Sequence, residues 1–495
     1  MHEFELKLQV PPERRAEVEA ALRHGPVTRQ RLQARYFDTP QGALRRAAMV
    51  LRLRREERRW VQTVKSSAGR EAFERLEHNV ACVSGTAPDT SLHDGSPAAP
   101  LLKQALAQTG EDAAALKPVF ATDVVRLTRM VTTAQTSVEV ALDEGRITAA
   151  GRELPVLEIE FELKSGAPSA LIELTQGWCA RHGLWLDPQS KAAAGHRLAA
   201  REPVAAAVTA SPVTVDRHAS VTDILNAVLE SVLQQVLANA RELAVEQATD
   251  KHVHQLRVGL RRLRSALREL RALPELSSLP PQVEEVLTGG FRQLGQHRDA
   301  LVLVPQLAQQ LAQAGAPPLA TPPPAPLPDI GAAVRDAEFQ SALLAVIGLQ
   351  HRLREGTPET VTTTKMLRKA VGKRLARLYR ESLESGGNFA SLSEPDRHRV
   401  RKRLKRLRYL SELMRPLYPA RKVDRFVDAL KDLQDTLGQY QDAAVGRRLW
   451  GEQAKVDPAA WFGAGWLTAR EEELARSCER ACRDALEDAA VFWKA

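Results

Sequence analysis

The chain of 495 residues carries 70 lysines and arginines against 61 acidic residues, a net charge of +9, and 44% of its residues are hydrophobic. This length predicts two or three domains with substantial cores, and the four cysteines exclude a disulfide scaffold and favour a reducing compartment. No apolar run reaches the roughly 18 residues of a membrane span, and the acidic start is wrong for a signal peptide, so we expect a cytoplasmic protein without a membrane partner.

The first 200 residues show mainly the two-residue alternation of strands. Strands are predicted at 2–10, 33–38, 49–55, 59–65, 70–80, 122–132, 136–142, 145–150 and 155–164. Helices are predicted at 11–23, 98–109, 168–182 and 190–200. Many strands with few helices indicate an antiparallel barrel or a strongly curved sheet.

The first predicted strand carries three charges on one face. Glu3, Glu5 and Lys7 alternate with apolar residues, so a strand places the charges on one side and the apolar groups on the other. A single strand of this kind is also typical of a solvated sheet face. It suits equally a polar cavity that holds metal ions and a polyanion.

Other predicted strands repeat the charged alternation. Their charged residues are Arg52, Arg54, Lys65, Arg75, Glu77, Arg126, Asp143, Glu158 and Glu160. If these faces point inward, the interior holds about six cations and six carboxylates, which is costly unless the charges are compensated. Mutual pairing in a half-exposed sheet would compensate them. We favour a cavity for a polyphosphate and divalent metal ions, because Lys and Arg bind phosphate oxygens and carboxylates bind Mg²⁺ or Mn²⁺.

After a predicted linker at 201–215, the pattern changes to the three- and four-residue spacing of helices. A proline-rich loop at 312–330 separates two copies of one unit, at about 216–311 and 331–490. Each copy contains a histidine followed by a basic repeat, His254 to Arg264 and His398 to Arg408. About 40 to 45 residues after each histidine comes a related L-G-Q segment, Leu294–Asp299 and Leu437–Asp442, so the chain predicts an internal duplication.

Helical geometry places the basic residues of each copy on one arc beside an apolar stripe. This predicted basic surface comprises His254, Arg257, Arg261, Arg264, Arg268, His398, Arg401, Lys405 and Arg408, with Lys369 and Lys373 as an extension. A charge run is usually a solvated face. Because these cations repel one another and occur twice, we favour an anionic partner, and the low aromatic content of 5% favours a uniform polyanion over nucleic acid.

Residues 1–200 resemble the CYTH family of triphosphate tunnel metalloenzymes. The resemblance rests on the opening E-x-E-x-K, Tyr36–Thr39, Leu51–Arg54, Lys65, Arg75–Glu77, Val138–Asp143, Glu158–Glu160 and Ser190–Lys191. It implies an eight-stranded antiparallel β-barrel that forms a triphosphate tunnel. It also implies that triphosphate is bound by Lys7, Arg52, Arg54, Lys65, Arg75, Arg126 and Lys191. The metal ligands would be Glu3, Glu5, Glu77, Asp143, Glu158 and Glu160, and the catalytic residues Glu5, Lys65, Glu158 and Glu160.

Residues 216–495 resemble a CHAD domain, an all-α module with duplicated histidine and basic motifs that is associated with inorganic polyphosphate. The order of the two domains is similar to that of bacterial inorganic triphosphatases. We therefore expect hydrolysis of inorganic triphosphate with Mg²⁺ or Mn²⁺, binding of long-chain polyphosphate, and a cytoplasmic location with association with polyphosphate granules. The alternatives are a hydrolase of thiamine or nucleoside triphosphates, a tunnel that cyclises ATP, and a polyphosphate-binding scaffold with weak catalysis.

Overall fold

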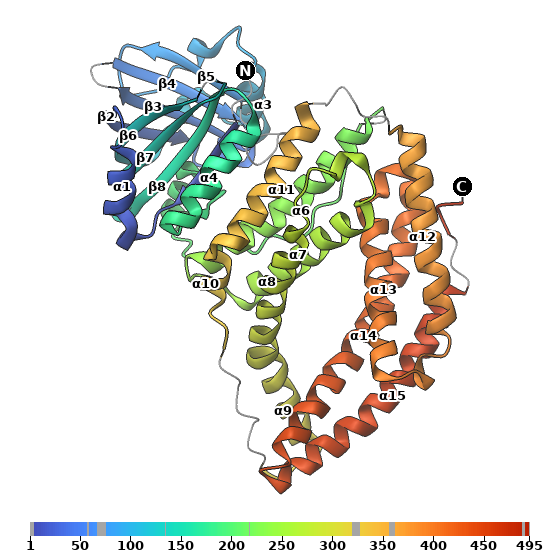
Figure 1. Cartoon of the computed structure of the whole chain (residues 1–495). Helices are drawn as coiled ribbons and strands as arrows, with labels where there is room; N and C mark the ends of the chain where they lie inside the picture. Colours follow the sequence, from blue (N-terminus) through green and yellow to red (C-terminus); the bar gives the residue numbers. More distant parts are fainter. Residues whose placement is uncertain are drawn as a thin grey trace. The chain divides into compact units, whose positions relative to one another are not determined.

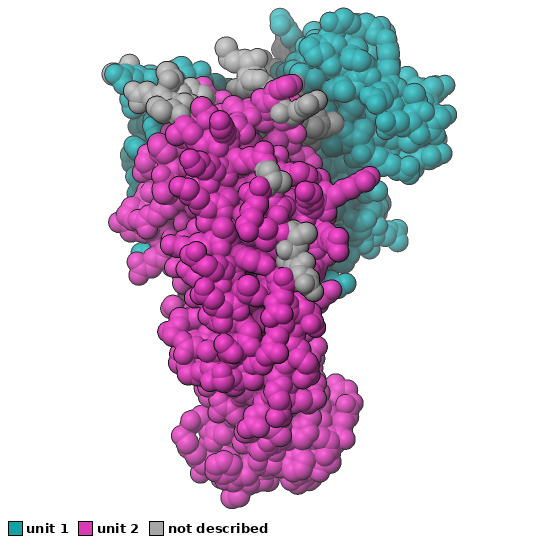
Figure 2. All heavy atoms as spheres, turned by 90° about the vertical axis from the view of Figure 1, so that its right-hand side faces the viewer, with its two compact units in different colours: residues 1–208, 236–252, 334–348 teal, residues 209–235, 253–333, 349–495 magenta. Residues whose placement is uncertain are grey.

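The computed structural model describes residues 4–56, 59–66, 76–133, 135–216, 218–318, 327–355, 362–487 and 491–494. Its contacts divide the chain into two compact units, drawn in different colours in Figure 2. Unit 1 comprises residues 1–208, 236–252 and 334–348, and unit 2 comprises residues 209–235, 253–333 and 349–495. Among the described residues, no helix combines the length and the apolar character needed to cross a bilayer.

Unit 1 is built on one antiparallel sheet, coloured blue to teal in Figure 1. In the described residues it has nine strands in the order β5-β4-β3-β2-β6-β7-β8-β1-β9. The strands are β1 (Phe4–Gln9), β2 (Thr28–Asp38), β3 (Met49–Glu56), β4 (Arg59–Ser66), β5 (Leu76–Cys82), β6 (Lys117–Thr132), β7 (Ser137–Ala149), β8 (Arg152–Ser165) and β9 (Trp185–Leu186).

The predicted antiparallel fold is confirmed, but the expected closed barrel of eight strands is wrong in detail. In the described residues β5 and β9 are the two ends of the strand order, so the sheet is open. The additional strand, β9, has two residues and pairs with β1 at Leu8 and Gln9. The predicted strands at 136–142 and 145–150 form one strand, β7, because its pairing with β6 and β8 continues through Gly145.

The helices before residue 208 pack against this sheet. They are α1 (Arg15–Leu22), α2 (Ala43–Arg46), α3 (Ala99–Thr109), α4 (Pro168–His182) and α5 (Lys191–Ala200). Trp178 of α4 packs edge-to-face on Phe161 of β8, which faces away from the charged side of that strand. On the other side, α5 packs so closely on β6 that a Cβ at Gly195 would lie 2.2 Å from the Phe120 ring. This packing brings Lys191, the first residue of α5, to the charged face of the sheet.

The alternation predicted for the first strand is confirmed. Phe4, Leu6 and Leu8 are buried, whereas Glu5 and Lys7 are partly buried on the opposite face. The Tyr36–Thr39 motif has a structural role at the end of β2. Asp38 is buried and accepts hydrogen bonds from the backbone N–H groups of Thr39, Leu44 and Arg45, at 2.8, 2.8 and 3.0 Å, and so fixes the turn into α2.

The chain after residue 220 is helical in its described parts, as predicted, and is coloured from green to red in Figure 1. The helices after residue 220 are α6 (Val221–Ala244), α7 (Asp250–Leu270), α8 (Gln282–Arg298), α9 (Val304–Gln313), α10 (Ile330–Arg335), α11 (Ala337–Glu355), α12 (Thr364–Gly386), α13 (Glu394–Leu413), α14 (Ala420–Gln453) and α15 (Trp461–Leu486). A π-helical turn at Asp299–Leu303 joins α8 to α9. Short 3₁₀ turns lie at Pro12–Arg14, Thr90–His93, Ala113–Ala115, Pro274–Leu276, Phe389–Ser391, Arg415–Leu417 and Pro458–Ala460.

Helices α7 and α13 carry the duplicated basic repeats, and both bury the predicted apolar stripe. The buried residues of the stripes are Leu256, Leu260, Leu263, Leu267, Leu270, Val400, Leu404, Leu407 and Met414. Glu269 of α7 has a fully buried side chain that binds Arg374 of α12 and lies 2.5 Å from Arg406 of α13. The apolar stripes and this buried ion pair hold the basic faces of α7 and α13 in fixed positions.

Candidate functional site: a charged tunnel and a basic cluster

Three carboxylates meet on the concave face of the sheet. Asp143 of β7 lies directly opposite Glu158 of β8, and Glu160 follows two residues later on the same face. Each of the three offers an oxygen atom, and these atoms lie within 4.8 Å of one another. We call Asp143, Glu158 and Glu160 the carboxylate group.

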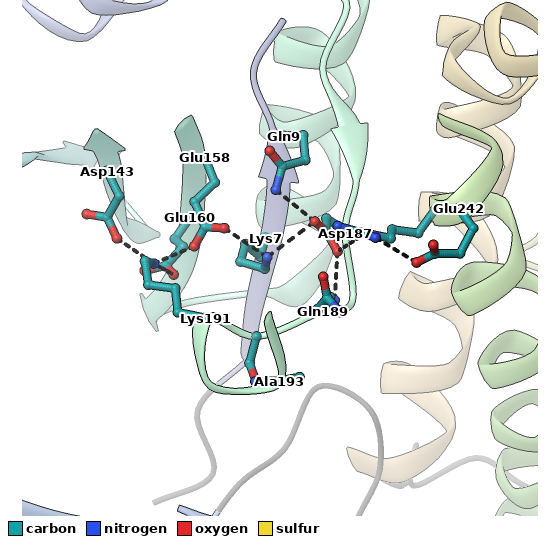
Figure 3. A network of polar contacts seen from close by, with 12 residues as sticks. Lys7, Gln9, Asp143, Glu158, Glu160, Asp187, Gln189, Lys191, Ala193 and Glu242 are labelled. Carbon is teal, nitrogen blue, oxygen red and sulfur yellow. Dashed lines mark hydrogen bonds and ion pairs between the residues drawn. The ribbon is translucent and has the colours of Figure 1, made fainter. Parts of the chain in front are cut away.

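Three cations from different elements bind the carboxylate group, and Figure 3 shows two of them, Lys7 and Lys191. Lys7 of β1 donates to Glu158 at 2.9 Å. Arg126 of β6 donates two hydrogen bonds of 2.7 Å to Asp143 and a further one to Glu160. Lys191 lies 2.6 Å from Asp143 and 3.0 Å from Glu160 and also binds Glu158.

The electrostatics of this group reflect close pairing of buried charges. Burial alone would raise the pKa of Glu160, but Arg126 and Lys191 outweigh it and hold that pKa well below the usual value. Burial lowers the pKa of Lys191, yet Glu158, Glu160 and Asp143 raise it well above the lysine value. The pKa of Lys7 is raised in the same way, with burial opposed by Glu158 and Asp187. Glu160, Lys191 and Lys7 are therefore charged at neutral pH.

A second set of cations lies on β3 and β4. Lys65 pairs directly with Glu77 of β5, whose carboxylate also lies 3.7 Å from Arg52. Arg54 binds Glu56. Burial and the neighbouring charge of Arg52 nevertheless lower the pKa of Arg54, so its positive charge is only partly compensated.

Both sets of cations line one cavity of ≈ 330 Å³. We call this cavity the charged tunnel, although the described strands do not close around it. Of the described tunnel residues predicted from the sequence, those that line it are Glu5, Lys7, Arg52, Arg54, Lys65, Glu77, Arg126, Asp143, Glu160 and Lys191. Glu158 lies beside it, bound to Lys7 and Lys191. Glu3 and Arg75 lie outside the described residues.

The residues present fit a divalent metal ion. Carboxylate oxygens are the donors that Mg²⁺ and Mn²⁺ prefer, and the carboxylate group brings three of them together in a cavity that a small ligand can enter. Glu5 lines the same cavity and interacts electrostatically with Arg126. Glu77 lies instead between Lys65 and Arg52, away from the carboxylate group, and its role as a metal ligand stays a prediction.

Asp187 lines the cavity and was not predicted from the sequence. It follows the two-residue strand β9 and is almost completely buried beside Lys7. Two signals in the sequence could have identified it: it precedes a proline, and it lies four residues before Lys191. Neither signal indicates that its carboxylate faces the first strand.

The basic repeats of α7 and α13 form a second candidate site, within unit 2. Burial lowers the pKa of Lys405 well below the lysine value, and the charges of Arg261, Arg401, Arg257 and Arg408 lower it further. Burial beside like charges also lowers the pKa of Arg257 and of Arg401 to about 10. We call these five residues the basic cluster.

Aromatic rings and two carboxylates support the basic cluster. The guanidinium groups of Arg257 and Arg261 lie 4.8 and 5.2 Å from the centre of the Phe291 ring, and Arg408 lies 4.4 Å from that of Tyr409. The carboxyl groups of Asp299 and Asp442, from the two L-G-Q segments, interact with Arg257 and Arg401, but burial raises the pKa of both. The acids therefore compensate the cluster only in part.

The other predicted basic residues lie around or beyond this cluster. His254 and His398 lie in the N-terminal parts of α7 and α13, and partial burial with neighbouring cations lowers the pKa of both. Arg264 lies 5.5 Å from the centre of the Phe291 ring, and Arg268 interacts with it. Lys369 and Lys373 are exposed on α12, and their part in binding stays a prediction. Arg298 interacts with His254 and Arg257 and was not predicted from the sequence.

Comparison with known proteins identifies both parts of the chain. The family model of the CYTH domain matches residues 1–195, and that of the CHAD domain matches residues 227–451. An inorganic triphosphatase of Haemophilus influenzae is 28% identical over 207 residues, which are 41% of this chain and 56% of that protein. The match thus spans about half of the length of that relative.

Solved structures resemble parts of the chain. The CHAD domain of the plant Ricinus communis covers 58% of this chain and 99% of its own, with 23% identity and a TM-score of 0.45. The PH1819 protein of Pyrococcus horikoshii covers 39% of this chain and 97% of its own, with 20% identity and a TM-score of 0.26. The matches of the family models confirm the resemblance seen in the sequence. The chain therefore carries a CYTH domain at residues 1–195 and a CHAD domain at residues 227–451.

Proposed function

We propose that the charged tunnel hydrolyses linear inorganic triphosphate to phosphate and diphosphate with the help of Mg²⁺ or Mn²⁺. The observation that carries the proposal is one cavity lined by Asp143 and Glu160 of the carboxylate group and by the cations Arg52 and Arg54, of which Arg54 is only partly compensated. The name of the Haemophilus influenzae relative supports the choice of substrate.

The residues of the tunnel can bind the substrate without a covalent intermediate. Arg52, Arg54 and Lys65 offer hydrogen-bond donors to one end of a triphosphate. Lys191 and Arg126 exchange carboxylate oxygens for phosphate oxygens as the substrate enters, which neutralises charge on the phosphoryl group in transfer. Asp143, Glu158 and Glu160 would hold the divalent ion, which would neutralise further charge and lower the pKa of a water molecule.

Release of phosphate from tripolyphosphate with Mg²⁺ or Mn²⁺ tests this function. We expect Glu160→Gln to reduce turnover at least about 100-fold, because it removes one charged oxygen from the carboxylate group. Glu153→Gln is the matched control, since Glu153 lies on the same strand but is exposed. Thiamine triphosphate and ATP at equal concentration test the alternative substrates. If the folded wild type hydrolyses none of these three substrates with either metal, the proposed hydrolysis is contradicted and the polyphosphate-binding scaffold remains as the alternative.

We further propose that the basic cluster binds inorganic polyphosphate. The support is the burial and the mutual repulsion of its five cations, which together lower the pKa of Lys405, Arg257 and Arg401, and a bound anion with many repeating charges would relieve this repulsion. A uniform polyanion suits two equivalent basic repeats. This binding would associate the protein with polyphosphate granules in the cytoplasm.

Fluorescence anisotropy with labelled long-chain polyphosphate tests this second proposal. Lys405→Ala should weaken binding by about tenfold or more, since a hydrogen bond to a charged group is worth about 1.5–3 kcal/mol. Arg399→Gln should bind like the wild type, because Arg399 is exposed on the same helix and pairs with Asp396. Duplex DNA as competitor distinguishes polyphosphate from nucleic acid. Equal affinity of Lys405→Ala and wild type would contradict the proposal.

A further inference from the structure

Asp187 connects the tunnel to residues much later in the chain. Its carboxylate lies 3.6 Å from Lys7 and accepts hydrogen bonds of 2.7 Å from the side chain of Gln9 and from the backbone N–H of Gln189. On the side away from Lys7, its Oδ1 lies 3.7 Å from Nε of Arg241, in the C-terminal part of α6. Residues 236–252 belong to unit 1, so this contact lies within one compact unit.

Arg241 is itself held in a buried network, of which Figure 3 labels Asp187 and Glu242. Its Nη1 donates to Glu242 at 2.6 Å, and Glu242 also lies 3.4 Å from Arg197 of α5. The side chains of Asp187 and Glu242 are each 2% exposed, and that of Arg241 is 13% exposed. Nε of Arg241 is buried and has no hydrogen-bond partner among the described residues. Asp187 lies 3.7 Å from this Nε atom, which is too far for a hydrogen bond, so the two side chains interact by electrostatic attraction.

The segment that carries Asp187 also contacts residues of α10 and α11. The backbone N–H of Leu186 donates to the side chain of Gln340 at 2.9 Å, and Arg335 lies 5.8 Å from the centre of the Trp185 ring. Residues 334–348 also belong to unit 1. The position of Asp187 therefore depends on residues much later in the chain, such as Gln340, which follows Leu186 by 154 positions.

We propose that Arg241 is a positioning residue of the triphosphate site, acting on Lys7 through Asp187. Asp187 lies between two cations, one of which lines the tunnel. With Arg241 present, the negative charge of Asp187 attracts both Arg241 and Lys7. Lys7 then keeps its position beside Glu158, where it can reach a phosphate. Without Arg241, Asp187 attracts Lys7 alone and draws it away from the substrate. The inference rests on the proposed function of the tunnel.

The test is a double-mutant cycle on the full-length protein with tripolyphosphate. Arg241→Gln should raise KM roughly 3- to 30-fold with a smaller change in kcat, the range expected for coupling through intermediate residues. In an Asp187→Asn background the same substitution should have no further effect, because the group through which it acts is neutral. Arg241→Lys keeps the charge and should restore most of the affinity.

Arg152→Gln is the matched control. Arg152 belongs to unit 1, is exposed at the start of β8 and does not line the cavity, so the KM of this variant should equal that of the wild type. Melting temperatures of all variants separate positioning from unfolding, and Arg241→Met, which is also uncharged, takes the place of Arg241→Gln in the cycle if the latter does not fold.

Two results would overturn the inference: a folded Arg241→Gln with unchanged KM, or an equal loss in both backgrounds. A Lys variant as weak as the Gln variant would also overturn it, since charge would then not be the cause. Titration calorimetry of tripolyphosphate binding to the same variants provides a second measurement. A wild type that binds tripolyphosphate but does not hydrolyse it contradicts the proposed function and leaves this test intact.

Discussion

Lys405 of α13 lies among four arginines, and burial together with their charges holds its pKa well below the lysine value. In the free protein a positive charge at this position is opposed by its surroundings. A bound polyanion reverses the balance, because it adds negative charge at the same place and raises the pKa of Lys405. Binding and protonation of Lys405 are therefore linked.

We predict that polyphosphate binding takes up protons and strengthens as the pH falls. The effect occurs between the lowered pKa of free Lys405 and its higher pKa in the complex. His254 and His398, whose pKa values are also lowered, add to it below their usual value of about 6.5. Calorimetry in buffers of different ionisation enthalpy measures the number of protons.

The control for this prediction is Lys405→Arg. An arginine remains protonated more readily than a lysine, so the variant should bind polyphosphate with less proton uptake above the range in which the histidines titrate. Uptake in that range equal to the wild type would show that other groups carry the protons.

At the scale of single elements, β7 shows how one glycine determines the form of the tunnel wall. Gly145 lies opposite Val124 of β6, and a Cβ at this position would lie 2.1 Å from the backbone oxygen of Asp123. The two backbones can approach this closely only without a side chain. The close approach lets β7 run unbroken past Asp143, which it places opposite both Arg126 and Glu158.

Gly145→Ala should therefore destabilise unit 1 by about 1–3 kcal/mol, the usual cost of overpacking. The measurement is the calorimetric transition of the full-length protein. Gly289→Ala in α8 is the opposite case, since a Cβ there has no neighbour within 4 Å, and alanine in a helix should be neutral or stabilise by about 0.5–1 kcal/mol. An unchanged transition in Gly145→Ala would contradict the close approach of β6 and β7.

In the helices α7 and α13, one local pattern defines two faces. A single spacing of three and four residues places leucines on the buried stripe and cations beside it. Local periodicity is thus sufficient to predict both faces of each helix. It does not predict that Arg257 and Arg261 of α7 lie beside Arg401 and Lys405 of α13, which depends on how the helices pack.

At the scale of the whole molecule, the compact units do not follow the order of the chain. Unit 1 contains residues 236–252 and 334–348 in addition to residues 1–208. The predicted linker at 201–215 contains no helix or strand among its described residues, yet Val208 exchanges two hydrogen bonds with Asn239, at 2.9 and 3.2 Å. Residues of the CHAD segment therefore contribute to the unit that holds the tunnel.

The sequence predicted most strands and helices of this protein, because the alternation of apolar and charged residues is a local property. It did not predict β9 or α2, which have two and four residues and are too short to show a period. It identified most of the charged residues of the tunnel from motifs and alternating faces. Their pairing, such as Arg126 with Asp143, required the register of strands far apart in the chain.

By itself, the sequence determined the two domains, the charged faces of their strands and helices, and the families that they resemble. Only the tertiary structure decided which charges meet: the carboxylate group with Lys7 and Lys191, the basic cluster, and the contact of Asp187 with Arg241. The physical reason is that a repeating pattern assigns a residue to a face through its immediate neighbours in the chain. The distance between two charges depends on strand register and helix packing, which bring together residues from distant parts of the chain.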